Sequence, residues 1–474
     1  MSETHVPAPR VVVIGGGISG LAAAHRLVDG GARVTVLEAS GRLGGKLYAG
    51  RIAGVPVDLG AESMLARRPE AVDLARAVGL ADQLCPPAAA AAGLYTRGAL
   101  RPMPAGHLMG VPGDLAPLAA SGVLTDAGLA RVREGATPPP LEAGEDVGIG
   151  EYVAARLGRE VVDRLVEPLL GGVYAGDAYR ISLRAAVPQL HEAARTPGPL
   201  TESVRGLLRR AAAGPAAGGP VFLGIEGGVG RLPLAVAEVV RARGGDVRTH
   251  APVRALTRAG AGWRVVTEGG AALSADAVVL ALPAPAAARL LAAEAPAAAT
   301  DLAGVEYASM ALVTMAFRRA EVAALPPGRG FLVPSVDGLT IKASTFSSNK
   351  WGWVDAGDPD LFVLRTSVGR HGAEADLERE DADLVERSLT DLRTTVGLTA
   401  RPVASRVERW AGGLPQYPVG HLDRVARVRE QVAKLPGLRV CGAVYDGVGI
   451  PACVASAHTA ADELLATALP GPPG

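Results

Sequence analysis

The stretch of the chain that most constrains the fold is the glycine-rich segment at residues 10–40, RVVVIGGGISGLAAAHRLVDGGARVTVLEAS. Its β-branched apolar run at residues 11–14 predicts a buried parallel strand. Three glycines then follow at the G-x-G-x-x-G spacing: Gly15, Gly17 and Gly20. A second apolar run ends at Glu38. Strand, glycine turn, helix, strand and acid in this order are typical of a dinucleotide-binding βαβ unit.

Each part of this unit has a chemical role. Gly15 permits the tight turn, Gly17 lets a pyrophosphate approach the backbone, and Gly20 lets the helix lie close to the sheet. The helix N-terminus offers N–H groups and a partial positive charge to phosphates. Glu38 accepts hydrogen bonds from ribose hydroxyls, and its charge disfavours the 2′-phosphate of NADP. The alternative interpretation is a glycine-rich turn that is only structural.

Composition narrows the function classes. The 474 residues contain 48 Lys plus Arg and 48 Asp plus Glu, so a net charge of zero offers no electrostatic argument for nucleic acid. Three scattered cysteines do not form a disulfide framework or a zinc site, and they fit a reducing compartment. The first ten residues lack the apolar core of a signal peptide, and prolines and Arg289 break the longest apolar run, residues 277–291. We therefore expect a cytoplasmic protein, with attachment to a membrane surface left open.

Periodicity predicts further elements. Helical spacing dominates residues 151–212, and four alternating segments within residues 310–368 predict an antiparallel sheet with one exposed face. Near the C-terminus, a strand at 438–441 is followed by glycines and by a helix from Ile450. This second strand–glycine–helix unit is able to direct N–H groups at the same ligand; an ordinary βα turn is the alternative.

Two turns near the first unit also favour ligand binding. In Gly41–Lys46, glycines allow close backbone approach while Arg42 and Lys46 bring cations toward a pyrophosphate. The hairpin expected at residues 48–60 ends in the polar segment Asp58–Ser63, which we expect to lie against a cofactor ring.

Several motifs together resemble one family. The glycine unit resembles the flavin-binding head of the amine oxidase and phytoene desaturase superfamily. A narrower resemblance, to protoporphyrinogen and coproporphyrinogen oxidases, rests on motifs spread over nearly the whole chain in the family's order: residues 167–177 (EPLLGGVYAGD) with Leu183, residues 227–233, residues 347–351 (SSNKW), residues 414–417 (LPQY), Gly420-His421, and residues 445–451 (YDGVGIP).

This resemblance implies FAD held without a covalent bond, and oxidation of a porphyrinogen by O2 with release of H2O2. The cofactor-binding residues expected from the motifs and the resemblance are Gly15, Gly16, Gly17, Ile18, Ser19, Gly20, Glu38, Ala39, Arg42, Lys46, Gly60, Ala61, Glu62, Ser63, Val253, Trp410, Val448, Gly449 and Ile450. A strand edge at Val253 suits adenine, and Trp410 offers a flat apolar wall. Because the flavin carries the chemistry, no acid–base pair is required, and we name no catalytic residue. His421 and His458 are interpreted as core or surface histidines.

The predicted fold class is α/β, with a Rossmann-like FAD-binding domain assembled from discontinuous segments, an α+β substrate domain and a helical insertion. We assign residues 1–85, 221–290 and 405–474 to the FAD-binding domain. Residues 86–220 are assigned to the insertion and residues 291–404 to the substrate-binding domain.

Substrate choice depends on charge, because coproporphyrinogen III carries four propionates and protoporphyrinogen IX carries two. Arg67 follows the polar turn closely, and related proteins hold a propionate-binding cation near this position. Arg68, Lys342 and Lys350 are further substrate-binding candidates, for each of which a solvated surface charge is the alternative. The resemblance favours coproporphyrinogen III, with protoporphyrinogen IX as the alternative. Contact of the insertion with lipid or with a ferrochelatase-like enzyme stays open.

Three rival functions are weighed against this one. An amine oxidase requires paired aromatic side chains that frame the flavin, and a chain with 4% aromatic residues does not indicate them. A carotenoid desaturase shares the flavin head but not the motif at residues 167–177. A tetrapyrrole carrier with FAD as a relic predicts no peroxide when porphyrinogen is added.

Overall fold

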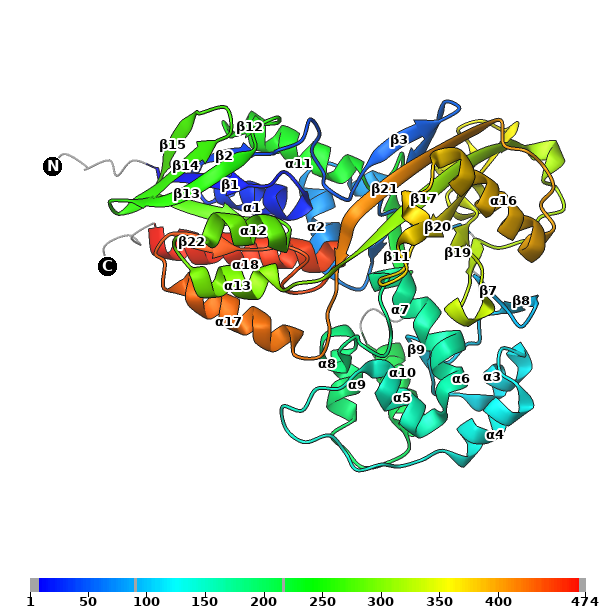
Figure 1. Cartoon of the computed structure of the whole chain (residues 1–474). Coiled ribbons are helices and arrows are strands. Elements are labelled where there is room, and N and C mark those ends of the chain that lie inside the picture. The colour runs from blue at the N-terminus through cyan, green and yellow to red at the C-terminus, as the bar shows by residue number, and fades with distance from the viewer. Residues whose placement is uncertain (1–7, 89–91, 215–217, 469–474) are drawn as a thin grey trace.

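The computed structural model describes residues 8–88, 92–214 and 218–468. Residues 1–7, within the segment that lacks a signal-peptide pattern, lie outside this range. Two large sheets, several small ones and a group of helices make up the described part of the molecule (Figure 1). We call the three main parts the parallel-sheet domain, the antiparallel-sheet domain and the helical insertion. None of the helices in the part of the chain described here has the length and apolarity needed to cross a bilayer.

The parallel-sheet domain is built on five strands that come from separate parts of the chain. All neighbours in the sheet run parallel, in the order β12-β2-β1-β16-β22. The strands are β1 (Arg10–Ile14), β2 (Arg33–Leu37), β12 (Asp246–Arg248), β16 (Ala277–Leu280) and β22 (Leu438–Val440). The apolar run of β1 is buried on both faces, as a central parallel strand requires. This sheet confirms the predicted α/β class.

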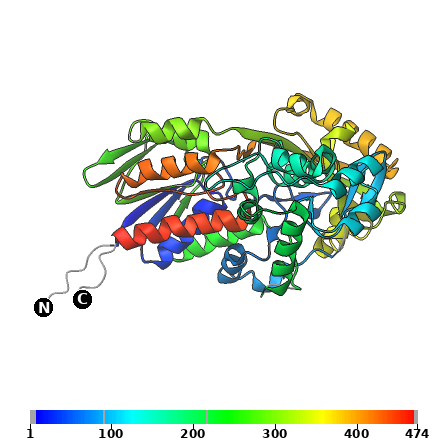
Figure 2. The same ribbon diagram turned by 90° about the horizontal axis from the view of Figure 1, so that it is seen from below.

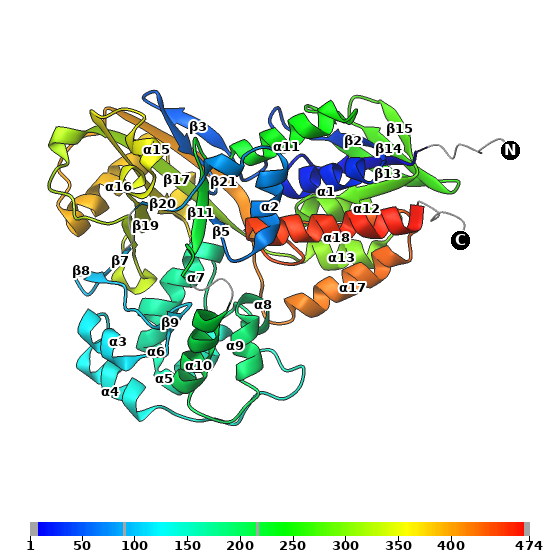
Figure 3. The ribbon, with the colours of Figure 1, turned by 180° about the vertical axis from the view of Figure 1, so that it is seen from behind.

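Helices and a small sheet cover the two faces of these five strands. On one face lie α1 (Ile18–Asp29), α2 (Pro69–Ala77), α11 (Arg231–Ala242) and α18 (Ile450–Ala468). On the other face lie β13 (Val253–Ala259), β14 (Gly262–Thr267), β15 (Ala272–Ala275), α12 (Ala284–Leu291), α13 (Pro296–Ala303) and α17 (His421–Ala433). Helices α1 and α18, from opposite ends of the sequence, lie side by side (Figures 2 and 3).

The antiparallel-sheet domain contains seven strands in the order β21-β17-β20-β19-β18-β7-β8. They are β7 (Gly93–Thr96), β8 (Ala99–Pro102), β17 (Tyr307–Arg318), β18 (Gly330–Leu332), β19 (Ile341–Thr345), β20 (Leu361–Val368) and β21 (Ala404–Pro415). Helix α16 (Asp381–Val396) covers one face. The other face packs against β3 (Ala49–Ile52), β4 (Val55–Asp58), α14 (Ser347–Lys350) and α15 (Gly352–Asp355).

The prediction of one exposed face for this sheet is wrong. Ala316 and Phe317 point to opposite faces of β17, and both are fully buried. The alternation of residue types does not distinguish a face that meets water from a face that meets other parts of the same chain.

The helical insertion has its own apolar core. Its helices are α3 (Leu115–Ser121), α4 (Asp126–Glu134), α5 (Ile149–Leu157), α6 (Arg159–Val161), α7 (Glu167–Tyr174), α8 (Leu183–Ala186), α9 (Pro188–Ala193) and α10 (Leu200–Ala213), with a π-helical turn at Val162–Val166 between α6 and α7. Short strands complete the fold: β5 (Met64–Leu65), β6 (Leu84–Cys85), β9 (His107–Leu108), β10 (Val111–Pro112) and β11 (Phe222–Ile225).

Two of the expected domain boundaries differ from the strand pairing. We assign residues 86–220 to the insertion, but β7 within them pairs in parallel with β18 and so joins the seven-stranded sheet of the antiparallel-sheet domain. Residues 405–415 were assigned to the cofactor domain, but they form β21 and pair with β17. Each segment pairs with a strand that is distant in the sequence. The local residue pattern does not identify that partner, so it does not show which sheet the segment joins.

Candidate functional site

The turn between β1 and α1 is packed so tightly at two glycines that no side chain fits. A Cβ on Gly15, which has a φ of +113°, lies 2.3 Å from the Ala281 carbonyl oxygen. A Cβ on Gly20 lies 1.9 Å from the Gly15 carbonyl oxygen. The absence of side chains therefore lets α1 approach the carboxyl ends of the strands closely.

Gly17 is different, because a Cβ at this position would have room. The nearest atom to a Cβ built on Gly17 is the Gly45 Cα at 3.9 Å. Gly17 is also the N-cap of α1, and no side chain accepts a hydrogen bond there. The first N–H groups of α1, at Ile18 and Ser19, therefore lie beside a residue that has no side chain. This arrangement suits the binding of a phosphate group.

The carboxylate of Glu38 stands beside this cradle. Its Oε2 accepts a hydrogen bond from the Gly16 N–H at 2.7 Å, and its Oε1 accepts one from the Ser40 N–H at 2.8 Å. The Glu38 carbonyl accepts from the Ala251 N–H at 2.8 Å, which brings the start of β13 at Val253 close to Glu38 and Ala39. The residues expected to contact ribose and adenine therefore lie close together at one edge of the sheet.

The loop after β2 returns to the glycine turn. The Gly44 N–H donates to the Gly16 carbonyl at 2.8 Å, and Gly17 and Gly44 form an isolated bridge. Burial lowers the pKa of Lys46, and no carboxylate pairs with its amine among the residues described. A half-buried amine that pairs with no carboxylate of the described residues is available to an anionic ligand.

Two aromatic side chains, Tyr48 and Trp410, lie next to Arg42 of this loop. The Arg42 guanidinium lies 4.2 Å from the centre of the Tyr48 ring and 5.3 Å from that of Trp410. The Trp410 indole N–H donates to the Leu59 carbonyl at 3.1 Å. Trp410 on β21 is therefore held against the Gly60–Ser63 turn.

That turn is fixed from several directions. The Ala61 N–H donates to the Lys46 carbonyl at 3.0 Å, and a Cβ on Gly60 lies 2.1 Å from the same oxygen. The Glu62 carboxylate lies 2.5 Å from the Lys350 Nζ and 3.1 Å from the Arg365 Nη2. Burial by itself raises the pKa of Glu62, but Arg365 and Lys350 outweigh it and lower the pKa to about 2.

The C-terminal glycine unit meets the N-terminal one. A Cβ on Gly442, with a φ of +124°, lies 3.7 Å from the Ser19 Oγ on α1. A Cβ on Gly449 would meet only the Pro451 Cδ, at 3.9 Å, and Val448 packs against the core of the helical insertion. Ile450 begins α18, which packs on α1. The two glycine turns therefore border the same region.

The four expected substrate cations are placed differently from one another. Arg67 is exposed and pairs with no carboxylate in the described part of the chain. Arg68 pairs with Glu70 at 2.6 Å. Lys350 is committed to Glu62.

Lys342, the remaining candidate, is 8% exposed on β19. Burial, together with the charge of Arg370, lowers the pKa of Lys342 to about 7, despite the opposing effect of Glu167. Glu167 in turn lies 3.4 Å from the Arg370 Nε. The Lys342 amine thus stands next to an ion pair that is already formed.

Sequence reasoning missed Arg365 and Arg370. Arg365 is a charged residue in the middle of the apolar strand LFVLRTSV, and that placement was the available signal. Asp58, expected near a cofactor ring, instead accepts hydrogen bonds from the Val229 and Gly230 N–H groups at the start of α11.

His421 and His458 are not placed as catalytic groups. His421 is 1% exposed, its Nε2 lies 2.8 Å from the Val444 carbonyl oxygen, and its ring stacks on Tyr417. Burial lowers the pKa of His421 to about 4, so the ring is neutral. His458 on α18 is half-buried.

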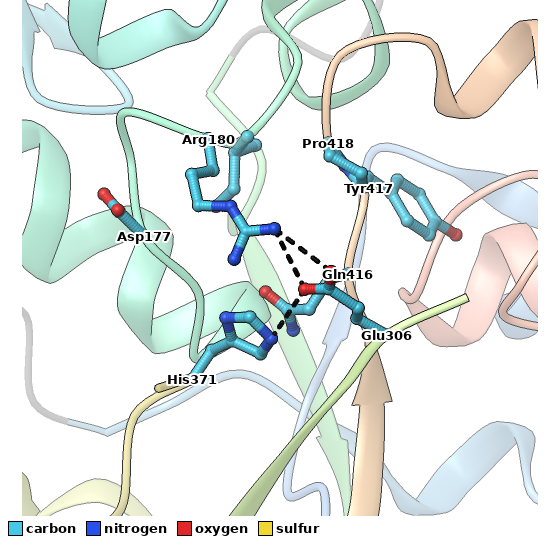
Figure 4. A pocket seen from close by; sticks show the side chains of 8 residues that line it. Asp177, Arg180, Glu306, His371, Gln416, Tyr417 and Pro418 are labelled. Atoms are coloured by element: carbon cyan, nitrogen blue, oxygen red, sulfur yellow. Dashed lines mark hydrogen bonds and ion pairs between the residues drawn. The ribbon is translucent and has the colours of Figure 1, made fainter. Parts of the chain in front are cut away.

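A small pocket lies where the insertion meets the two connections between the sheets (Figure 4). Arg180 and His371 point at Glu306, with Arg180 Nη2 at 3.0 Å and His371 Nε2 at 3.1 Å from its carboxylate. The accessible volume of about 10 Å³ accommodates no more than a water molecule. This pocket is a junction, and it is far too small for a tetrapyrrole.

A helix N-terminus without a side-chain cap, a carboxylate at the end of the second strand and a half-buried lysine fit a dinucleotide cofactor, and they define a dinucleotide-binding protein. The chain matches the model of the family described as flavin containing amine oxidoreductases over residues 18–465, and it belongs to that family. It is an FAD-dependent oxidoreductase.

Three known proteins illustrate the similarity. The chain is 39% identical to a coproporphyrinogen III oxidase of Mycobacterium tuberculosis, over 96% of both chains. It is 31% identical to a protoporphyrinogen oxidase of Bos taurus, over 96% of this chain and 98% of the relative. A crystal structure of a protein from Exiguobacterium sp. 255-15 superimposes with a TM-score of 0.86 at 34% identity, over 97% of this chain and 99% of that chain.

Proposed function

We propose that this protein oxidises coproporphyrinogen III to coproporphyrin III with O2, releasing H2O2, in haem biosynthesis. The observation that carries the proposal is the similarity along 96% of both chains to a coproporphyrinogen III oxidase. Protoporphyrinogen IX is the second candidate substrate, because a relative named protoporphyrinogen oxidase matches over a similar length.

The cofactor-binding residues are proposed to divide the FAD molecule among them. Glu38 accepts hydrogen bonds from the ribose, and backbone groups at Val253 meet the adenine. The N-terminus of α1 and the Lys46 amine bind the pyrophosphate, because each offers positive charge without a protein counter-ion.

The ring end of the site is proposed to lie between Trp410, the Gly60–Ser63 turn and the Val448–Ile450 segment. When bound between these residues, FAD would supply the two-electron redox chemistry that links the substrate to O2. The task of the chain is to hold the macrocycle against the flavin and to keep the surroundings apolar. No side chain is required as a general base.

The direct test of the function uses purified protein with each porphyrinogen. We expect a yellow protein, fluorescent porphyrin and H2O2, and a larger kcat/KM for coproporphyrinogen III than for protoporphyrinogen IX. A colourless, fully folded protein that binds no FAD contradicts the proposal. Porphyrinogen binding without peroxide would instead indicate a carrier, and the reverse substrate order would indicate protoporphyrinogen oxidation.

We propose that Arg67 binds a substrate propionate, since it is exposed near the polar turn and has no partner in the described part of the chain. Arg67→Ala is expected to raise KM about tenfold for coproporphyrinogen III and less for protoporphyrinogen IX, with kcat little changed. Steady-state kinetics on both substrates measure this effect.

Arg68→Ala is the matched control, because Arg68 is the next residue and already pairs with Glu70. Unchanged kinetics in Arg67→Ala, or an equal effect of Arg68→Ala, would remove Arg67 from the site. Lys342 remains a proposed second cation for a propionate, whereas the Lys350 amine is held at the Glu62 carboxylate instead.

The proposal extends to location and partners. We place the enzyme in the cytoplasm, in peripheral contact with a membrane surface and in transient contact with a ferrochelatase-like enzyme. The exposed side chains of Val221 and Phe222, 50% and 37% accessible, support a contact surface there. Val221→Ser with Phe222→Ser should release the protein from sedimenting vesicles; unchanged co-sedimentation would contradict membrane contact.

A further inference from the structure

A buried carboxylate in this structure is paired with two cations rather than one. Glu62 follows β4, Lys350 ends α14, and Arg365 lies within β20. The side chains of the three residues are only 11%, 14% and 13% exposed, respectively. We call them the charge cluster.

The charge cluster carries surplus positive charge. The pKa of Glu62 is lowered to about 2, so its carboxylate is ionised at all relevant pH values. One negative charge therefore faces two positive ones. A single cation would neutralise Glu62, and burying the second costs desolvation free energy that the ion pairs only partly return. Neutralising the Glu62 carboxylate therefore does not by itself explain the second cation.

The cluster is attached to the proposed flavin-facing turn by a hydrogen bond. The Arg365 Nη1–H donates to the Gly60 carbonyl at 2.9 Å. The nearby carboxyl group of Asp58 points instead at the N–H groups of α11. Burial raises the pKa of Asp58 to about 7, so at pH 6 it is mainly neutral and leaves the charge surplus intact.

We propose that Glu62, Lys350 and Arg365 form a positioning cluster whose surplus positive charge, at the Gly60–Ser63 turn, makes bound FAD easier to reduce. Positive charge in a low-dielectric site stabilises the more electron-rich form of a neighbouring group. The inference rests on the proposed function, because it requires the flavin ring to lie against this turn.

Two substitutions change the net charge of the cluster in opposite directions, so we expect them to shift the reduction potential of bound FAD in opposite directions. Lys350→Met lowers the cluster charge from +1 to zero, and Glu62→Gln raises it to +2. At pH 6 and a fixed solution potential, we expect the ratio of reduced to oxidised bound FAD to fall about tenfold in Lys350→Met and to rise about tenfold in Glu62→Gln. Spectroscopic redox titration of the FAD-loaded protein measures both ratios.

The double variant Glu62→Gln/Lys350→Met keeps a charge of +1 on Arg365 and is expected to return to the wild-type potential. If Glu62→Gln alone does not fold, the comparison of Lys350→Met with the double variant still tests whether the cluster charge sets the potential. Lys434→Met is the matched control: Lys434 is a lysine on the surface that pairs with Glu430, and its removal should leave the potential unchanged.

The inference is overturned if the FAD potential shifts in the same direction in the two single variants, or in neither. It is also overturned if the potential of the double variant lies far from the wild-type value. A purely structural cluster predicts lowered melting temperatures but no such pattern of signs. Failure of the proposed function is distinguishable, since in that case the wild-type protein binds no FAD or oxidises no porphyrinogen. The redox titration of a wild-type protein that does both tests the cluster alone.

Discussion

The three glycines of the motif have different physical roles in the turn after β1. Gly15 and Gly20 have no room for a Cβ because backbone oxygens lie 2.3 and 1.9 Å away, whereas a Cβ on Gly17 comes no closer than 3.9 Å to another atom. The same motif therefore contains residues needed for packing and a residue left free for a ligand. This separation allows fold and cofactor binding to be tested independently.

Gly20→Ala is expected to destabilise the FAD-free protein by about 1–3 kcal/mol, because the new methyl group overlaps the Gly15 carbonyl. Gly17→Ala should leave that stability within about 0.5 kcal/mol of wild type while raising the Kd for FAD about tenfold. Urea denaturation and FAD titration check the two effects. Equal loss of stability in both variants would contradict the assignment.

Asp58 is expected to make stability depend on pH in an unusual direction. Burial raises its folded pKa from 3.8 to about 7, despite two backbone N–H donors. The folded state therefore binds more protons than the unfolded state between pH 4 and 7, and this contribution to stability is lost as pH rises through that window. The total change is at most about 4 kcal/mol.

Asp58→Asn removes the titrating group and should flatten this part of the profile relative to wild type. Denaturation at several pH values from 4 to 8 measures the difference. A difference between the two proteins that does not change with pH would show that Asp58 ionises normally in the folded state.

Small residues set the distance between elements in the parallel-sheet domain. Ala22, Ala23 and Ala24 of α1 and Ala457 of α18 are fully buried in the core that these two helices share. Large side chains there would separate the helices that carry the two glycine turns. The proposed FAD site therefore depends on close contact between opposite ends of the sequence.

Ala457→Leu is expected to lower the free energy of unfolding by about 1–3 kcal/mol, because the core has no space for the added atoms. Thr459→Leu, two residues further along the same helix and exposed, is the control and should change stability little. Similar losses in both variants would indicate an effect of helix propensity rather than packing.

At the scale of the whole molecule, one loop of the insertion binds both connections between the sheets. The Gln416 Nε2–H donates to the Tyr174 carbonyl and the Ser182 N–H to the Tyr417 carbonyl, each at 2.8 Å. The Glu306 carboxylate adds ion pairs to Arg180 and His371 (Figure 4). These contacts join all three parts of the fold at one place.

Glu306→Gln should loosen this junction without unfolding the protein. Exposed ion pairs contribute little, so we expect a loss of stability below about 1 kcal/mol. Amide hydrogen exchange in residues 175–182 should nevertheless become several-fold faster, because local opening no longer breaks these pairs. Unchanged exchange there, with Glu202→Gln on α10 as the exposed control, would contradict the role of Glu306.

Local pattern was enough to predict the α/β class, the glycine turn and the acid after β2. Their physical causes lie within about thirty consecutive residues: an apolar run, a turn that excludes side chains, and a helix terminus. The family resemblance added the expected FAD and substrate. The strand at 438–441 and the helix after it were also predictable for this reason.

The tertiary structure alone decides which charges meet. Glu62 and Lys350 are 288 residues apart, and both looked like ligand-binding groups until they were found paired. Arg365 was invisible as a partner because a single arginine in an apolar strand does not indicate what faces it. Likewise, both faces of the antiparallel sheet are buried because other segments of the chain cover them. Electrostatic pairing and burial arise from contacts across the fold, and the order of residues along the chain does not contain those distances.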